Sequence, residues 1–367
     1  MVEILPITEL MKAVREVLDL HTTFQWEHFL EHGLDAHFIA RVIKFDGTEV
    51  LARASDYLVQ VDYKPPFEGT FTLPKDKRGV SIYSRRAFLY PQLYAYVKLP
   101  SLSLLGNEAE MLYFLGLENG SNIFNGIASF VLATSSTYTN RLYAYAGPLQ
   151  GIVKLNIDVA KPSDFNTAYH SYRVVLTRNL TLFFIGSRLR AVAVQCLQGG
   201  YVNVKENVLP YSIALIPPMP SSLTTLVGLF AINRTATAPS DLVAPLSPYS
   251  FRVSDGNEII PLSLPLYLDN SDTVLAGYSI SSGSVTSHPI PTFGYSRKTL
   301  RFMASQSGTI EIQVYTLTGN WRTYDSVSIS ANTLLSYSIE DEVILTRAVF
   351  TPSTYPANIL EAEVSMS

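Results

Sequence analysis

The first fifty residues carry the only helical pattern in the chain. Apolar residues recur there with the i, i+3, i+4, i+7 spacing of one helix face, at Ile7, Leu10, Met11, Val14, Val17 and Leu18. A second helical stretch over 24–32 ends at Gly33, a residue that suits the position after a helix end. The pattern predicts a short helical region at the N-terminus.

The pattern changes beyond residue 50. Short runs rich in tyrosine and β-branched residues alternate with Pro, Gly, Asn and Ser, which is typical of strands joined by turns. The clearest runs are 93–97, 110–115, 126–131, 141–145 and 172–176. Residues 180–185 and 189–194 flank Gly186 and predict a hairpin. No helical pattern of about 10–15 residues separates these runs, so a parallel α/β sheet is disfavoured.

The strand pattern loosens over 255–277 and restarts in the last hundred residues. Alternation places Ile310, Ile312 and Val314 on one strand face. The final strand shows the same alternation at Leu360, Ala362, Val364 and Met366. A turn over 318–320 predicts a hairpin. We therefore predict a mainly β fold, with a helical region over 1–50 followed by two β-sandwich, jelly-roll-like domains over 51–265 and 266–367.

Composition fits a chain that buries a large core. Hydrophobic residues make up 47% of the 367 residues and charged residues only 16%, against about 25% in average soluble domains. This composition argues against long disordered segments. The net charge of −4 argues against nucleic acid as the main partner. The single cysteine, Cys196, excludes a disulfide framework within one chain and a cysteine-rich zinc module.

Neither an export signal nor a membrane span is expected. Glu3 stands where a signal peptide carries positive charge, and Pro6 interrupts the apolar stretch. The most apolar later segment, 213–232, contains three prolines and cannot supply about 20 continuous helical residues. We expect a chain made in the cytoplasm that leaves the cell only by assembly, lysis or a dedicated system.

The runs 94–100, 111–119 and 126–130 resemble the early strands of concanavalin A-like sandwiches of the legume-lectin and laminarinase type. The later runs 169–175, 182–186 and 191–194 are similar to a strand and hairpin of that family. The resemblance implies a concanavalin A-like sandwich over roughly 55–255 and marks fold more than chemistry. The C-terminal runs 294–300, 307–313, 321–324 and 347–352 resemble small β-sandwich modules of virion surface proteins.

An enzyme of the laminarinase type would need two apposed carboxyl groups. Retaining hydrolysis places them about 5–5.5 Å apart, and the family carries them in a Glu-x-Asp-x-(x)-Glu run on one strand. No such run occurs in the β region: Glu108 and Glu110 lack a third acid, and Glu118 stands alone. No catalytic residue is therefore assigned, and a divergent glycoside hydrolase is the weaker alternative.

Metal and nucleophile motifs are equally sparse. His28, Glu31 and His32 match the His-x-x-Glu-His zinc motif, but no third ligand is indicated. With His21 and His37 nearby, we interpret these histidines as solvated or interface residues. If the four histidines meet at an oligomer interface, their protonation near pH 6.5 would loosen it. Cys196 is expected to be buried as a small hydrophobe. Calcium would need several oxygens together, which 118–119 and 269–272 offer only in part. No metal or cofactor is assigned.

Two tyrosine pairs are the best candidates for binding sugar. Tyr94 and Tyr96 flank an alanine on one strand, and Tyr143 and Tyr145 repeat the pattern. If the two strands were neighbours on one sheet, four rings would form a stacking platform with hydroxyls at its rim, which suits carbohydrate. The competing interpretation is that the rings fill the space between two sheets.

Together these patterns lead us to predict a non-enzymatic structural and attachment protein of a virion, such as a spike, turret, fibre or capsid-associated protein. Its expected location is the virion, after assembly in the host cytoplasm. The predicted assembly interface consists of Leu10, Met11, Val14 and Leu18. Expected partners are other virion subunits, further copies of this chain in a homo-oligomer, and a cell-surface glycan. The alternative is a cellular lectin-like carbohydrate-binding protein.

Overall fold

The structure is a computed structural model that describes residues 23–25, 34–60, 69–99, 113–118, 126–133, 141–147, 153–219, 226–232, 241–254, 260–316 and 318–367. The described fold is mainly β, as the sequence predicts. The chain divides into two compact units: one comprises 1–142, 162–176 and 222–257, and the other comprises 143–161, 177–221 and 258–367. No described helix is long and apolar enough to cross a membrane.

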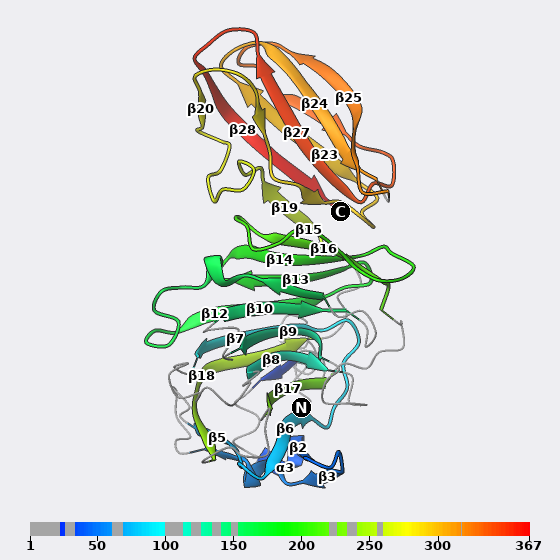
Figure 1. Ribbon diagram of the computed structural model, residues 1–367. Coiled ribbons are helices and arrows are strands. Elements are labelled where there is room, and N and C mark those ends of the chain that lie inside the picture. The colour runs from blue at the N-terminus through cyan, green and yellow to red at the C-terminus, as the bar shows by residue number, and fades with distance from the viewer. Residues whose placement is uncertain are drawn as a thin grey trace, which may run out of the picture. The chain divides into compact units, whose positions relative to one another are not determined.

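The first unit contains an antiparallel sheet in the order β12-β7-β18-β5-β4, with β1 also paired to β18. Figure 1 labels β12, β7, β18 and β5 of this sheet. Its strands are β1 (Thr23–Gln25), β4 (Leu58–Gln60), β5 (Gly69–Leu73), β7 (Gln92–Lys98), β12 (His170–Leu176) and β18 (Leu242–Ser254). Because β7 lies between β12 and β18, both of its edges are hydrogen-bonded.

A second antiparallel sheet of this unit has the order β9-β8-β17-β6-β2-β3. Its strands are β2 (Phe38–Lys44), β3 (Glu49–Ala52), β6 (Lys77–Ser84), β8 (Tyr113–Glu118), β9 (Gly126–Ala133) and β17 (Leu226–Ile232). The short helices α3 (Leu34–His37) and η1 (Ala54–Asp56) lie beside it in sequence. Phe130 on β9 packs edge-on against Tyr172 on β12, with ring centroids 5.3 Å apart, so these two sheets share a core.

The second unit begins within β10 (Arg141–Ala146), which pairs with β11 (Val153–Asn156). The short helix η3 (Asp158–Ala160) follows. A further sheet has the order β15-β16-β14-β13, from β13 (Leu180–Ile185), β14 (Arg188–Gln195), β15 (Val202–Lys205) and β16 (Ser212–Ile216). The predicted hairpin of β13 and β14 is confirmed, and Gly186 has the positive φ of 64° that its turn requires.

The C-terminal part of the second unit is a β-sandwich. One sheet has the order β19-β28-β23-β26, with β20 on β28, and the other β21-β27-β24-β25, with β22 on β27. The strands are β19 (Leu262–Pro265), β20 (Ser279–Ile280), β21 (Val285–Thr286), β22 (Ile290–Pro291), β23 (Lys298–Ala304), β24 (Gly308–Tyr315), β25 (Trp321–Ile329), β26 (Leu335–Ser338), β27 (Leu345–Pro352) and β28 (Ala357–Met366). Phe302 and Phe350 join the sheets, with ring centroids 5.0 Å apart.

Alternation explains most of this sandwich. Ile310, Ile312 and Val314 are buried as predicted, and the β24–β25 hairpin turns at Gly319, whose φ is 85°. The last strand departs from the prediction at Leu360, which is 44% exposed. The register with β23 shifts between Met303 and Ala304, so Leu360 is an extra residue in a bulge. The expected alternation therefore holds only from Ala362 onward.

Two expectations for the N-terminus are affected by the structure. The helix predicted over 24–32 is wrong at its start, because Phe24 and Gln25 belong to β1 and pair with β18. The spacing of apolar residues is a local pattern and cannot predict that a distant strand will pair with this segment. The predicted helix carrying Leu10, Met11, Val14 and Leu18 lies outside the described residues, as do His21, His28, Glu31 and His32.

Residues 260–277 fall within the stretch expected to join two sandwiches. Here β19 pairs with β28, and the Leu266 amide donates a hydrogen bond to the Ala362 carbonyl. Asp269 and Asp272 bind cationic side chains of β14 and β15. The described part of this stretch is thus tied to neighbouring strands of the second unit along its length.

Candidate functional site

Strand β7 presents two chemically different faces. Leu93, Ala95 and Val97 are each 1% exposed and belong to the core. Gln92, Tyr94, Tyr96 and Lys98 alternate with them and are all partly exposed. Because side chains alternate along a strand, the two tyrosines point away from the core. The interpretation that these rings fill the space between sheets therefore does not hold for β7.

Strand register surrounds the two tyrosines with polar residues. Tyr94 stands opposite Arg173 of β12 and Tyr96 opposite Ser171, and both partners are partly exposed. On the other edge of β7, Arg252 and Ser250 of β18 hold the equivalent register positions. We call the surface formed by Gln92, Tyr94, Tyr96, Lys98, Ser171 and Arg173 the tyrosine face. It combines aromatic rings, hydroxyls and cations on adjacent antiparallel strands.

A third ring extends the tyrosine face. Tyr169 lies just before β12, with its ring centroid 5.6 Å from that of Tyr96, and the Lys98 ammonium lies 5.7 Å from the Tyr169 centroid. A turn positions this ring: the amides of Thr167 and Ala168 both donate to the Asp164 carbonyl. The Asp164 carboxylate lies 2.8 Å from Nε2 of His170, which braces the same turn.

The electrostatics of the tyrosine face are one-sided. Strands β1, β4, β5, β7, β12 and β18 contain no Asp or Glu, whereas Lys98, Arg173 and Arg252 occur on them. Burial lowers the pKa of Arg173, and the neighbouring Tyr94 opposes that shift. A guanidinium stays charged throughout the ordinary pH range, so Arg173 contributes a positive charge to the tyrosine face.

The second tyrosine pair has a different environment. The neighbours of β7 are β12 and β18, so β10 is not adjacent to it and the single four-ring platform is not formed. Tyr143 is only 3% exposed and Tyr145 is partly exposed. The Lys154 ammonium lies 4.3 Å from the Tyr143 centroid and 5.7 Å from that of Tyr145. Burial lowers the pKa of Lys154. This pair is engaged by a lysine of its own unit.

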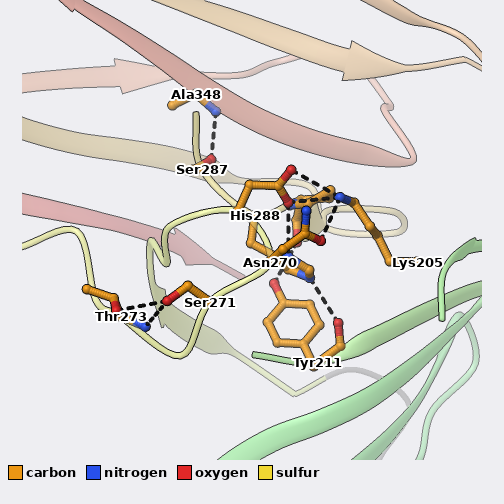
Figure 2. A network of polar contacts seen from close by, with 10 residues as sticks. Lys205, Tyr211, Asn270, Ser271, Thr273, Ser287, His288 and Ala348 are labelled. Atoms are coloured by element: carbon orange, nitrogen blue, oxygen red, sulfur yellow. Dashed lines mark hydrogen bonds and ion pairs between the residues drawn. The ribbon is translucent and has the colours of Figure 1, made fainter. Parts of the chain in front are cut away.

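A second polar cluster lies in the other unit (Figure 2). The Lys205 ammonium is 3.0 Å from both carboxylate oxygens of Asp269 and 3.1 Å from Oδ1 of Asn270. His288, 1% exposed, donates from Nε2 to the Tyr211 carbonyl at 2.9 Å. The Tyr211 hydroxyl donates to the Pro289 carbonyl at 2.6 Å. These contacts tie β15 and the start of β16 to the segments around 269 and 288.

The acids of 269–272 are neutralised by side chains of the same unit. Asp272 accepts hydrogen bonds from Arg188 at 2.6 Å and from Arg190 at 3.1 Å, and Asp269 accepts from Lys205. No group of three or more His, Cys, Asp or Glu suited to a metal occurs among the described residues. The partial calcium ligand set suggested by 269–272 is instead used in ion pairs.

Cys196 differs from its prediction. It follows the end of β14 and is partly exposed, although burial still raises the pKa of its thiol to about 11. The strand alternation that predicted its burial stops at Gln195, one residue earlier. A thiol with a raised pKa is a poor nucleophile, so the residue adds no chemistry to a site.

Sequence reasoning found Tyr94 and Tyr96 but missed the rest of the tyrosine face. Lys98 continues their alternation and was detectable on β7 itself. Arg173, Ser171 and Tyr169 join only through the pairing of β7 with β12, which spans more than 70 residues of chain. Nothing in a local pattern predicts that register.

Comparisons with known proteins find likeness only among solved structures. No family model matches the sequence, and no curated protein matches it. A β-glucanase of Bacillus licheniformis is 9% identical, with 64% of this chain and 99% of that chain covered and a TM-score of 0.40. A laminarinase of Rhodothermus marinus is 9% identical, with 61% and 91% covered and a TM-score of 0.38. The Crh5 transglycosylase is 14% identical, with 62% and 87% covered and a TM-score of 0.31.

These comparisons correct two predictions. The sequence pointed to a non-enzymatic virion protein, whereas the similar structures named above are enzymes, so the virion role and the assignment as a non-enzyme are both contradicted. A small number of charged residues describes the surface of a chain and carries no information about its chemistry. At these identities and TM-scores no catalytic residue transfers to this chain. The resemblance to virion modules receives no support either.

Proposed function

We propose that this chain binds a polysaccharide along the tyrosine face. The observation that carries the proposal is the placement of Tyr94 and Tyr96 two residues apart on the outward side of β7, each beside a polar residue of β12. Aromatic rings stack on the apolar faces of sugar rings, and flanking hydroxyl and guanidinium groups bond sugar hydroxyls. Because these groups succeed one another along β7 and β12, the face suits a polymer that extends along the two strands.

Cleavage of a bound polysaccharide would need groups from elsewhere. Retaining hydrolysis requires two carboxyl groups about 5–5.5 Å apart, and the strands of this sheet contain none. A catalytic pair would have to come from outside those strands. The proposal is therefore stated for binding, and release of reducing ends is measured separately.

The test is affinity electrophoresis of the full chain through gels that contain soluble neutral or acidic polysaccharides. Tyr94→Ala and Tyr96→Ala should each weaken binding about tenfold, because a lost ring contact contributes up to about 1.5 kcal/mol. Tyr201→Ala is the matched control, since Tyr201 is 49% exposed and lies in the other unit. Undiminished binding by both β7 variants, or no binding to any polymer, would contradict the proposal.

A further inference from the structure

The charge on the tyrosine face is opposite in sign to that of the whole chain. The protein carries a net charge of −4, yet the six strands of this sheet carry Lys98, Arg173 and Arg252 and no acid. The nearby Asp164 lies 2.8 Å from His170. His170 pairs with Val97, a core residue of β7, and so belongs to the opposite side of the sheet from Tyr94 and Tyr96. Cations are thus concentrated where the rings are.

The cations are placed beside the rings. Arg173 stands opposite Tyr94 in register, and its side chain is partly exposed like that of Tyr94. Lys98 lies four residues further along β7, a separation of about 13 Å at strand spacing, and its ammonium is near the ring of Tyr169. A chain lying along β7 would therefore meet Tyr94 with Arg173 beside it, then Tyr96, and then Lys98.

A neutral sugar does not require this arrangement. Hydrogen bonds to sugar hydroxyls need only neutral groups such as those of Ser171, Gln92 and the tyrosines, whereas a guanidinium gains most from an anionic oxygen pair. Arg173 presents a partly exposed guanidinium on the tyrosine face, where an anionic group of a bound polymer can pair with it.

We infer that the polysaccharide bound by the tyrosine face is anionic, with carboxylate or sulfate groups that pair with Arg173 and Lys98. The inference rests on the proposed function and adds the chemical class of the ligand. Rings stack on the sugars, and the two cations select the charged groups of the polymer.

The experiment measures binding of the full chain to three polymers: a neutral β-glucan, a polyuronate and a sulfated galactan. The wild-type chain should prefer one of the anionic polymers over the glucan by at least about tenfold. That preference should shrink as salt rises from about 0.1 to 1 M, where the screening length falls from about 10 to 3 Å. The anionic polymer that is preferred identifies the charged group.

Variants separate this inference from the proposed function. Arg173→Gln and Lys98→Gln should each weaken binding of the anionic polymer about tenfold or more and weaken glucan binding by much less, so that the preference for the anionic polymer shrinks. Arg322→Gln, at an exposed position of β25, is the matched control. Tyr-dependent binding with no preference for charge, or a preference untouched by both variants, would overturn the inference and leave polysaccharide binding standing. No binding to any polymer would overturn both.

Discussion

Nδ1 of His288 lies 3.4 Å from the Asp269 carboxylate, close enough for an ion pair but without a well-formed hydrogen bond. The reason lies at the other end of the ring. Because Nε2 donates to the Tyr211 carbonyl, it must carry the proton, and the neutral ring then presents a lone pair to Asp269. Only the protonated ring could donate to both partners. Burial nevertheless lowers the pKa of His288, against the pull of Asp269.

This arrangement predicts an acid-sensitive second unit. Since the folded-state pKa of His288 lies below its ordinary value of about 6.5, the unfolded chain binds the proton more tightly. Stability should therefore decrease as the pH falls from about 6.5 towards the lowered pKa. Thermal unfolding followed by circular dichroism between pH 7.5 and 5 measures this loss.

The matched variants for that titration are His288→Gln and His170→Gln. The glutamine amide can still donate to the Tyr211 carbonyl but does not titrate, so the decrease between pH 6.5 and 5 should disappear. His170 has a side chain that is 25% exposed, and its variant should keep the decrease. Asp269 titrates in another pH range. Burial alone would raise its pKa, but the nearby His288 and Lys205 lower it, so the stability that the Asp269 carboxylate contributes is lost below about pH 3.9. An identical pH profile for the wild type and His288→Gln would refute the assignment.

The ion pair of Lys205 and Asp269 should show measurable coupling. Each side chain is about one-quarter exposed or less, and both carboxylate oxygens accept from the ammonium. In a double-mutant cycle with Lys205→Met and Asp269→Asn, we expect a coupling free energy of about 1.5–3 kcal/mol from urea unfolding. The more exposed pair Arg301–Glu361 is the reference and should give about 0.5 kcal/mol. Equal coupling at the two pairs would contradict the prediction.

Gly308 should tolerate no side chain. A Cβ built there would lie 2.4 Å from the Thr351 carbonyl oxygen and 2.9 Å from Cα of Pro352, both backbone atoms of β27. Gly308→Ala must push two paired strands apart and should cost about 3 kcal/mol of unfolding free energy. Gly199→Ala is the control, because a Cβ there meets nothing within 4 Å, and it should change stability by less than about 0.5 kcal/mol. A similar melting temperature for the two variants would show that β24 and β27 can yield.

Local patterns accounted for much of the fold. The strand of Ile310, Ile312 and Val314 was predictable because apolar and polar residues alternate along it with a period of two. Gly186 and Gly319 indicated the positions of two turns. The errors arose where a distant partner decides the outcome. Phe24 forms a strand because it pairs with β18. Leu360 is exposed because the pairing of β28 with β23 leaves it as the extra residue of a bulge.

The candidate site was predictable to a smaller extent. Tyr94 and Tyr96 stand out by spacing alone, but only strand pairing brings Arg173 beside them. The same pairing rules out the four-ring platform, because β12 and β18 occupy both edges of β7. Lys205, Asp269 and His288 meet across more than 60 residues of sequence, and no local motif signals such a meeting.

The strict alternation of β7 has an evolutionary consequence. An insertion or deletion of one residue that is not absorbed by a bulge, as Leu360 is in β28, would reverse the faces of every residue beyond it, turning core residues such as Val97 towards solvent and rings such as Tyr96 inward. Evolution can therefore vary this surface by substituting residues or by changing the segments that connect the strands. Ligand preference changes by substitution, while the length of β7 is conserved.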